Sequence, residues 1–175
     1  MLSLKLSPMP PALKKLAPAT AAVFMALLLI NLMLSNEQAP QGIVSFQLAG
    51  TAEQSLRILA AWGEEGRFWA ALSLWLDFLF LALYTATLVV FTSYLLSDRP
   101  GVRERKLGGW VKTLFIAAGL ADAAENTFLL YNMSNATDGL SLAATAMALM
   151  KFTGLLLGGA GLVVIRAERR RPLHS

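Results

Sequence analysis

The chain has no cysteine and a single histidine, His174, near its C-terminal end. The absence of cysteine excludes disulfides, thiolate metal ligands and a cysteine nucleophile. With His174 as the only imidazole, a histidine-based zinc site, haem ligation by histidine and a Ser-His-Asp triad are excluded as well. A glycine-rich phosphate loop and internal repeats are also missing. The sequence therefore predicts no cofactor and no metal site, and it favours a protein that is not an enzyme.

Long apolar runs, by contrast, dominate the sequence. Hydrophobic residues make up 56% of it, whereas a soluble domain has about 45–50% even when glycine is counted. They form four blocks, each as long as the roughly 20 residues needed to cross a bilayer core of about 30 Å. The blocks cover approximately residues 16–35, 68–96, 110–132 and 140–165. We predict an all-α fold, with residues 1–175 forming one integral membrane domain, a four-helix transmembrane bundle.

The formal net charge of +4 is distributed as expected for a membrane protein rather than for a nucleic-acid binder. Basic residues precede the first block, separate the second from the third, and follow the fourth: Lys5, Lys14, Lys15, Arg99, Arg103, Arg105, Lys106, Arg166, Arg169, Arg170 and Arg171. By the positive-inside rule, both termini and the middle loop are cytoplasmic. We therefore predict a multi-pass protein of the plasma membrane, with membrane lipids as partners at its basic tail and no nucleic acid.

The longest loop, residues 36–66, contains a further helix signal. Its stretch GIVSFQLAG is expected to be extended, and Thr51 then precedes Gln54 with the spacing of a capping box. The apolar residues expected to share one face of the following helix are Ala52, Leu56 and Leu59. We predict a short extracytoplasmic amphipathic helix between helices one and two, lying on the outer leaflet or on top of the bundle. A lid over an outward-facing site is the alternative.

The stretch GLADAAENTFLLYN, residues 119–132, carries charge inside an apolar block. Asp122, Glu125 and Asn126 share one helix face at i, i+3 and i+4. Alanines flank that face, so it should point toward a closely packed helix rather than toward lipid. In the fourth block, Gly154, Gly158 and Gly161 allow close helix packing; contact within the chain is the simpler interpretation, and a homodimer seam is the alternative.

Polar residues of all four blocks lie at similar depth. At about 1.5 Å per residue, Asp122, Glu125 and Lys151 lie roughly 18, 22 and 21 Å from the cytoplasmic end. By the same rise, Asn31 and Asp77 lie at roughly 21 and 27 Å. A charge at the bilayer centre costs at least about 2.5–3.5 kcal/mol, so such residues are candidates for function. The predicted ligand- or proton-binding residues are Asp77, Asp122, Glu125, Asn126, Lys151, Asn31 and Tyr84.

The predicted cluster has three carboxylates and one ammonium. We expect Asp122 and Glu125 to approach Lys151, which neutralises one of them. We expect at least one of the remaining carboxylates to be protonated near neutral pH. A bound cation or a water-filled cavity that solvates the charge is the alternative. A purely structural ion pair that holds the helices in register is the alternative.

Four stretches of the chain have a familiar pattern: FQLAGTAEQSLRILAAWG, LDFLFLALY, LADAAENTFLL and MKF. Over Ile43 to Phe152 the sequence resembles a family of small bacterial integral membrane proteins that has no assigned function. The resemblance implies a bacterial inner membrane and supplies no catalytic residues. A looser, architectural likeness is to the emopamil-binding-protein-like sterol binders and isomerases, whose four helices also carry intramembrane acids. Since the apolar blocks contain no histidine, an isomerase is disfavoured.

Three functions are compatible with these features. The first is binding or carrying a small cationic or lipophilic ligand with proton linkage, Lys151 serving as the internal counter-charge; transport by so small a bundle would call for a homodimer. The second is a non-catalytic accessory or scaffold subunit whose buried ion pairs are structural. The third is a lipid-modifying enzyme that uses a carboxylate as acid or base, assisted by Tyr84 or Lys151. It ranks last because no residue is marked as a nucleophile.

Overall fold

The computed structural model describes residues 8–97 and 101–168, and over these residues the chain is helical without a β-strand. The helices are α1 (Pro11–Leu34), α2 (Ile43–Gln47), α3 (Ala52–Leu96), α4 (Val102–Ser134) and α5 (Asp138–Glu168). The predicted all-α class is confirmed. Residues Lys5, Arg99, Arg169, Arg170, Arg171 and His174, which entered the charge and cofactor arguments, lie outside the described residues.

Four helices, α1, α3, α4 and α5, are long and apolar enough to cross a membrane. They contain the four predicted segments except for Ser35, which directly follows α1. The shortest of them, α1, has 24 residues and is therefore about 36 Å long, which exceeds a bilayer core of about 30 Å. The described chain thus has the helices of a multi-pass membrane protein.

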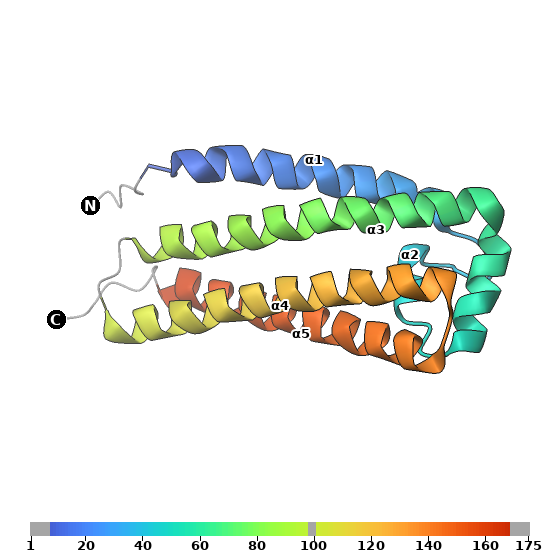
Figure 1. The fold of residues 1–175 in the computed structure, drawn as a ribbon. Coiled ribbons are helices and arrows are strands. Elements are labelled where there is room, and N and C mark those ends of the chain that lie inside the picture. The colour runs from blue at the N-terminus through green and yellow to red at the C-terminus, as the bar shows by residue number, and fades with distance from the viewer. Residues whose placement is uncertain (1–7, 98–100, 169–175) are drawn as a thin grey trace.

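The long helices pack side by side in the order α1, α3, α4, α5, and α3 also contacts α5 (Figure 1). Because α1 packs mainly along α3, it lies at the edge of the bundle. The tightest pairing joins α4 and α5. A side chain at Gly158 would overlap the Phe115 ring, and one at Gly161 would overlap Val111. These glycines therefore serve packing within the chain, as the simpler interpretation of the sequence predicted.

The apolar core has two parts. One cluster lies near the end where α3 bends and includes Phe46, Ile58 and Leu129. The other lies toward the opposite end and includes Phe115 and Ile165. Along α4, the polar residues Asp122, Glu125 and Asn126 fall between Phe115 and Leu129. Packed apolar layers therefore separate this polar level from both ends of the bundle.

The residues predicted to form a loop helix are the first part of α3. Thr51 Oγ1 accepts a hydrogen bond from the Gln54 amide at 3.2 Å, so the capping signal is confirmed. Gly63, with φ of 61° and ψ of −161°, then interrupts the helix, which a residue without a side chain tolerates readily. The segment before Gly63 turns across the end of the bundle (Figure 1). Its extracytoplasmic location stays a prediction.

The predicted face of this segment is wrong at Leu56, which is 52% exposed, whereas Leu59 is 1% exposed. The other buried residues are Ser55, Ile58 and Trp62, which were not predicted. The reason is polar docking against other helices, which an apolar pattern does not register. Trp62 Nε1 donates to the Leu34 carbonyl at 2.8 Å. Ser55 Oγ lies 3.0 Å from Ser141 Oγ, and Asn132 Nδ2 donates to both hydroxyls.

The extended conformation predicted for GIVSFQLAG is also wrong, because residues 43–47 form α2. Asn31 Oδ1 accepts a hydrogen bond from the Ile43 amide at 2.8 Å and so satisfies a free amide at the start of this helix. Gly42, at φ of 60°, allows the chain to turn there. The Thr145 hydroxyl of α5 donates to the Gln47 carbonyl at 2.9 Å at the other end of α2.

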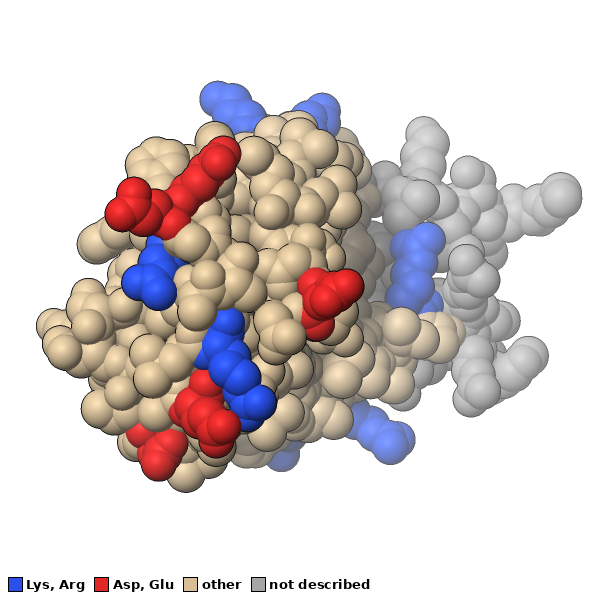
Figure 2. Space-filling model, turned by 90° about the vertical axis from the view of Figure 1, so that its right-hand side faces the viewer, with Lys and Arg blue, Asp and Glu red and all other residues tan. Residues whose placement is uncertain are grey.

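The two ends of the bundle differ in charge. At one end α1 and α4 begin and α3 and α5 end (Figure 1), and the described basic residues there are Lys14, Lys15, Arg103, Arg105, Lys106 and Arg166. Figure 2 looks onto the opposite end, where acidic and basic side chains are mixed. This asymmetry agrees with the orientation predicted by the positive-inside rule. The orientation itself stays a prediction.

Candidate functional site

Lys151 of α5 lies between two carboxylates of α4. Its Nζ is 3.0 Å from Asp122 Oδ1 and 2.7 Å from Glu125 Oε2. The exposed fractions of the three residues are 6% for Lys151, 2% for Asp122 and 0% for Glu125. The Phe152 ring centroid is 5.0 Å from the same nitrogen. As predicted, both acids face the interior and approach Lys151, whose ammonium is fully engaged by groups of its own chain.

Helix α3 contributes two further members of the predicted set. The Tyr84 hydroxyl lies 3.0 Å from Asp122 Oδ2 and donates a hydrogen bond to it. Asp77 Oδ2 accepts a hydrogen bond from Asn126 Nδ2 at 2.8 Å. Because Asp77 and Tyr84 are seven residues apart in α3, they project from the same face, two turns apart. Three helices thereby meet through side chains that the sequence had singled out.

The cluster contains more buried acceptors than donors. Glu125 Oε1 and Asn126 Oδ1 are buried and have no hydrogen-bond partner among the described residues. Glu125 Oε2 has its ion-pair contact with Lys151, although that contact is not aligned as a hydrogen bond. An unsatisfied buried polar group costs roughly 1–3 kcal/mol. The cluster thus contains more buried polar groups than a simple polar contact between two helices requires.

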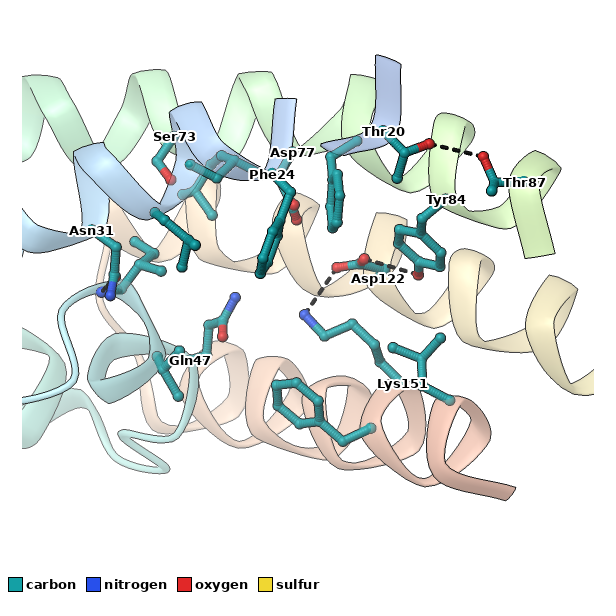
Figure 3. A pocket seen from close by; sticks show the side chains of 18 of the residues that line it. Thr20, Phe24, Asn31, Gln47, Ser73, Asp77, Tyr84, Thr87, Asp122 and Lys151 are labelled. Atoms are coloured by element: carbon teal, nitrogen blue, oxygen red, sulfur yellow. Dashed lines mark hydrogen bonds and ion pairs between the residues drawn. The ribbon is translucent and has the colours of Figure 1, made fainter. Parts of the chain in front are cut away.

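A cavity of about 470 Å³ lies beside this cluster (Figure 3). Asp77, Tyr84, Asp122 and Lys151 reach its surface, whereas Glu125 and Asn126 lie behind it. The aromatic residues in its wall are Phe24, Phe80, Tyr84 and Phe152. The Phe24 and Phe80 rings stack at 5.6 Å, and the Phe80 and Tyr84 rings lie 5.2 Å apart. The cavity thus combines an apolar, aromatic wall with one charged face.

Different segments line the two ends of the cavity along the bundle. Ile43, Val44 and Gln47 of α2 line one end. Toward the other end, the hydroxyls of Thr20 and Thr87 lie 2.8 Å apart and link α1 to α3. The side walls come from α1 and α3 on one flank and from α5 on the other. Helices α1 and α5 both line the cavity but have no extensive packing against each other.

Asn31 is the predicted site residue that does not join the charged cluster. Its side chain holds the α2 loop, accepting from the Ile43 amide and donating to the Gln41 carbonyl at 3.3 Å. It does line the same cavity, near the end formed by α2 (Figure 3). The depth along the helix axis that the sequence predicted was therefore too coarse to distinguish Asn31, which anchors the α2 loop, from the acids that lie one or two helical turns away.

Several polar residues of the cavity were missed by sequence reasoning. Gln47 is 6% exposed and lines the cavity, but the extended conformation expected for its segment gave it no defined direction. Thr20, Ser73 and Thr87 also line it. Of these, only Ser73 gave a signal, because it precedes Asp77 by one helical turn. The threonines were indistinguishable from ordinary hydroxyls within apolar helices.

Within residues 8–97 and 101–168, no group of three or more His, Cys, Asp or Glu side chains has an arrangement that could hold a metal ion. The polar groups at the site are carboxylates, one ammonium, a phenol and amides. Comparison with known proteins adds no assignment, since no protein family, curated protein or solved structure matches the chain. The resemblance to a bacterial membrane family stays an expectation from the sequence.

Proposed function

We propose that the cavity binds a small amphiphilic cation and that this binding is linked to a proton. The carrying observation is a carboxylate at the wall of an aromatic cavity without a basic partner. Asp77 lines the cavity, and none of the ion pairs formed by the described residues includes it. The neutral amide of Asn126 donates a hydrogen bond to Asp77 Oδ2.

The sign of the ligand's charge follows from the neighbours. The one ammonium at the cavity, that of Lys151, is already in contact with Asp122 and Glu125. It is therefore poorly available to an anion. Asp77 adds a third carboxylate to this pair, so the face of the cavity favours a positive charge. In a low-dielectric setting such an attraction is far less screened than in water.

The apolar part of the ligand is supported by the remaining wall. Phe24, Phe80 and Tyr84 present ring faces and edges close to Asp77, and aromatic rings attract cations as well as apolar groups. Access between α1 and α5 passes Leu28 and Phe152, which are both exposed large apolar residues. This route favours a ligand that partitions into the bilayer over one that is confined to water.

Proton linkage follows from competition for one carboxylate. A cation binds Asp77 best when that group is ionised, whereas an unoccupied carboxylate in an apolar wall is stabilised by a proton. Binding of the cation therefore releases a proton. Whether the bound ligand also crosses the membrane depends on movement of α1 relative to α5, and flux measurements address that step separately.

A headgroup series tests the proposal in nanodiscs. Phenylbutylamine, phenylbutanol and phenylbutyrate share one apolar part and differ in charge, and empty nanodiscs report their partitioning. The amine should bind most tightly and the carboxylate least. Asp77→Asn should weaken amine binding about tenfold or more, because a charge-assisted contact is worth about 1.5–3 kcal/mol. Glu37→Gln removes an exposed carboxylate of the outer loop and should change nothing. An amine that binds no better than the alcohol to the wild type overturns the proposal.

A scaffold role is the second candidate, and the buried triad favours it. Lys151, Asp122 and Glu125 join α4 to α5 whether or not a ligand is present. A stable partner that co-purifies with the chain, is lost on mutation of the α3 segment before Gly63 and is retained in Asp77→Asn would support this role. If the wild-type protein co-purifies with no stable partner, this result counts against a scaffold role.

A further inference from the structure

A second cavity, of about 780 Å³, lies at the basic end of the bundle. It runs between the last turns of α3 and α5 and shares no lining residue with the cavity at Asp77. Phe91 and Leu95 of α3 form one wall, and Leu162 and Val163 of α5 form the other. Apart from Arg166, the groove has no charged residue in its lining.

The groove adjoins a buried apolar cluster. Leu95 and Ile165 are 3% and 2% exposed and belong to the same buried cluster as Val111 and Phe115. Phe91 and Leu162 pack against that cluster. A groove with such walls can take a hydrocarbon chain, because its lining residues other than Tyr94 and Arg166 are apolar.

Arg166 supplies the complementary charge at the mouth of the groove. It lies in the last turn of α5 and is exposed. No ion pair or hydrogen bond links it to another residue in the described part of the chain. A guanidinium presents paired N–H donors that match the oxygens of a phosphate. Its place at a helix end corresponds to the level at which lipid phosphates lie.

The surrounding charges favour an anionic lipid in this leaflet. Lys14 and Lys15 begin α1, and Arg103, Arg105 and Lys106 begin α4 at the same end of the molecule. Each basic residue near an anionic membrane surface contributes about 1 kcal/mol of attraction, and basic pockets between transmembrane helices accommodate anionic headgroups.

We propose that this groove is a binding site for an anionic phospholipid. One acyl chain lies between α3 and α5 against the Leu95–Leu162 walls, and the phosphate contacts Arg166. The site is independent of the cavity at Asp77 and does not rest on the function proposed for it.

Native mass spectrometry tests the assignment with lipids that differ only in headgroup. The full-length protein is incubated with equal amounts of phosphatidylglycerol and phosphatidylcholine that have identical chains, and the ratio of retained lipids is measured. The wild type should retain phosphatidylglycerol preferentially. Arg166→Gln should lower this preference about fivefold, which corresponds to about 1 kcal/mol. Arg103→Gln, at the same end but outside the groove, is the matched control and should lower the preference less, because it removes only general surface attraction.

Two further arms separate the groove from general surface charge. Leu162→Trp fills the groove and should reduce retention of both lipids, with folding verified by circular dichroism. Glycerol phosphate, a headgroup without chains, should not compete with phosphatidylglycerol. Equal effects of Arg166→Gln and Arg103→Gln, or displacement of the lipid by glycerol phosphate, would overturn the proposal.

Discussion

The Lys151 ammonium lies 2.7 Å from Glu125 Oε2, across the interface of α5 and α4. The same nitrogen contacts Asp122, one turn earlier in α4, at 3.0 Å. One cation thus serves two buried carboxylates, so its removal leaves both without compensation. This arrangement determines the sign and the size of the stability change that we predict for a substitution of Lys151.

Lys151→Met should lower the free energy of unfolding by roughly 3–5 kcal/mol, the usual cost of leaving a buried charge unpaired. Reversible unfolding in mixed micelles with increasing SDS provides the measurement. Adding Glu125→Gln to Lys151→Met should recover part of the loss, because the double variant buries one carboxylate fewer. Absence of recovery with either Glu125→Gln or Asp122→Asn would contradict the ion-pair assignment.

The matched control for this series is Arg57→Met. Arg57 pairs with Glu53 at 3.1 Å, but the side chains are 57% and 80% exposed. A pair of this kind contributes about 0–1 kcal/mol because water and salt screen it. The difference in unfolding free energy between Lys151→Met and Arg57→Met therefore measures the effect of burial rather than the loss of a cation as such.

Tyr84→Phe should cost about 0.6–2 kcal/mol of unfolding free energy, the range for polar contacts between membrane helices. The substitution removes the donor to Asp122 Oδ2 and retains the ring that packs on Phe80. Tyr131→Phe is the control, since Tyr131 is 66% exposed on the neighbouring helix. Equal effects of the two substitutions would mean that the buried hydrogen bond has no net value.

Gly158→Ala should destabilise the α4–α5 interface, whereas Gly159→Ala should not. A methyl group at Gly158 would overlap the ring of Phe115, which is 1% exposed and cannot move aside, but nothing lies within 4 Å of one at Gly159. Overpacking costs about 1–3 kcal/mol, and alanine itself favours a helix over glycine by up to about 1 kcal/mol. Because both variants share this gain in helix propensity, it cancels in the difference between their unfolding free energies. A stabilised Gly158→Ala variant would refute the close packing.

Binding of phenylbutylamine should weaken on acidification, because a proton and the cation compete for Asp77. Above the carboxyl group's pKa the affinity should level off, since the group is then ionised in the free protein. Asp77→Asn should bind weakly at every pH and lose this dependence. Titrations over the range in which the amine stays protonated test the linkage. A wild-type profile that is flat, or that keeps its slope in Asp77→Asn, would exclude Asp77 as the linked group.

Membrane orientation can be tested directly because the chain has no cysteine. Single substitutions Glu37→Cys and Asn135→Cys should react with a membrane-impermeant maleimide added to intact cells. Arg103→Cys should react only after the membrane is opened. All three side chains are exposed, so accessibility within the fold does not limit the reaction. The reverse labelling pattern would invert the topology.

The sequence predicted the four long helices and most of the charged cluster because both depend on local pattern. Apolar length determines where a helix can cross a membrane, and i, i+3 and i, i+4 spacing determines which side chains share a face. Asp122, Glu125 and Asn126 were placed together in this way. Lys151 joined them because the cost of burying its charge required a partner of opposite sign.

The parts that were missed depend on contacts between distant segments. The start of α2 is fixed by Asn31, twelve residues before Ile43, and the buried face before Gly63 is fixed by Asn132 and Ser141. Neither contact produces a periodic pattern of residues in the local sequence. Gln47 enters the cavity only because α2 forms, so its role was not predictable without that contact.

The three residues between α4 and α5 have a consequence for how the protein is made. This short turn brings α5 back along α4, so that Asp122 and Glu125 can contact Lys151. The Thr137 amide in the turn donates a hydrogen bond to Asn132 Oδ1. When α4 leaves the ribosome its acids still lack their counter-ion, and a charge in the bilayer core is costly. The hairpin, rather than either helix alone, is the smallest unit in which these charges are paired. Insertion of α4 is thus coupled to synthesis of α5, and a chain truncated before Lys151 should be retained at the translocon or degraded.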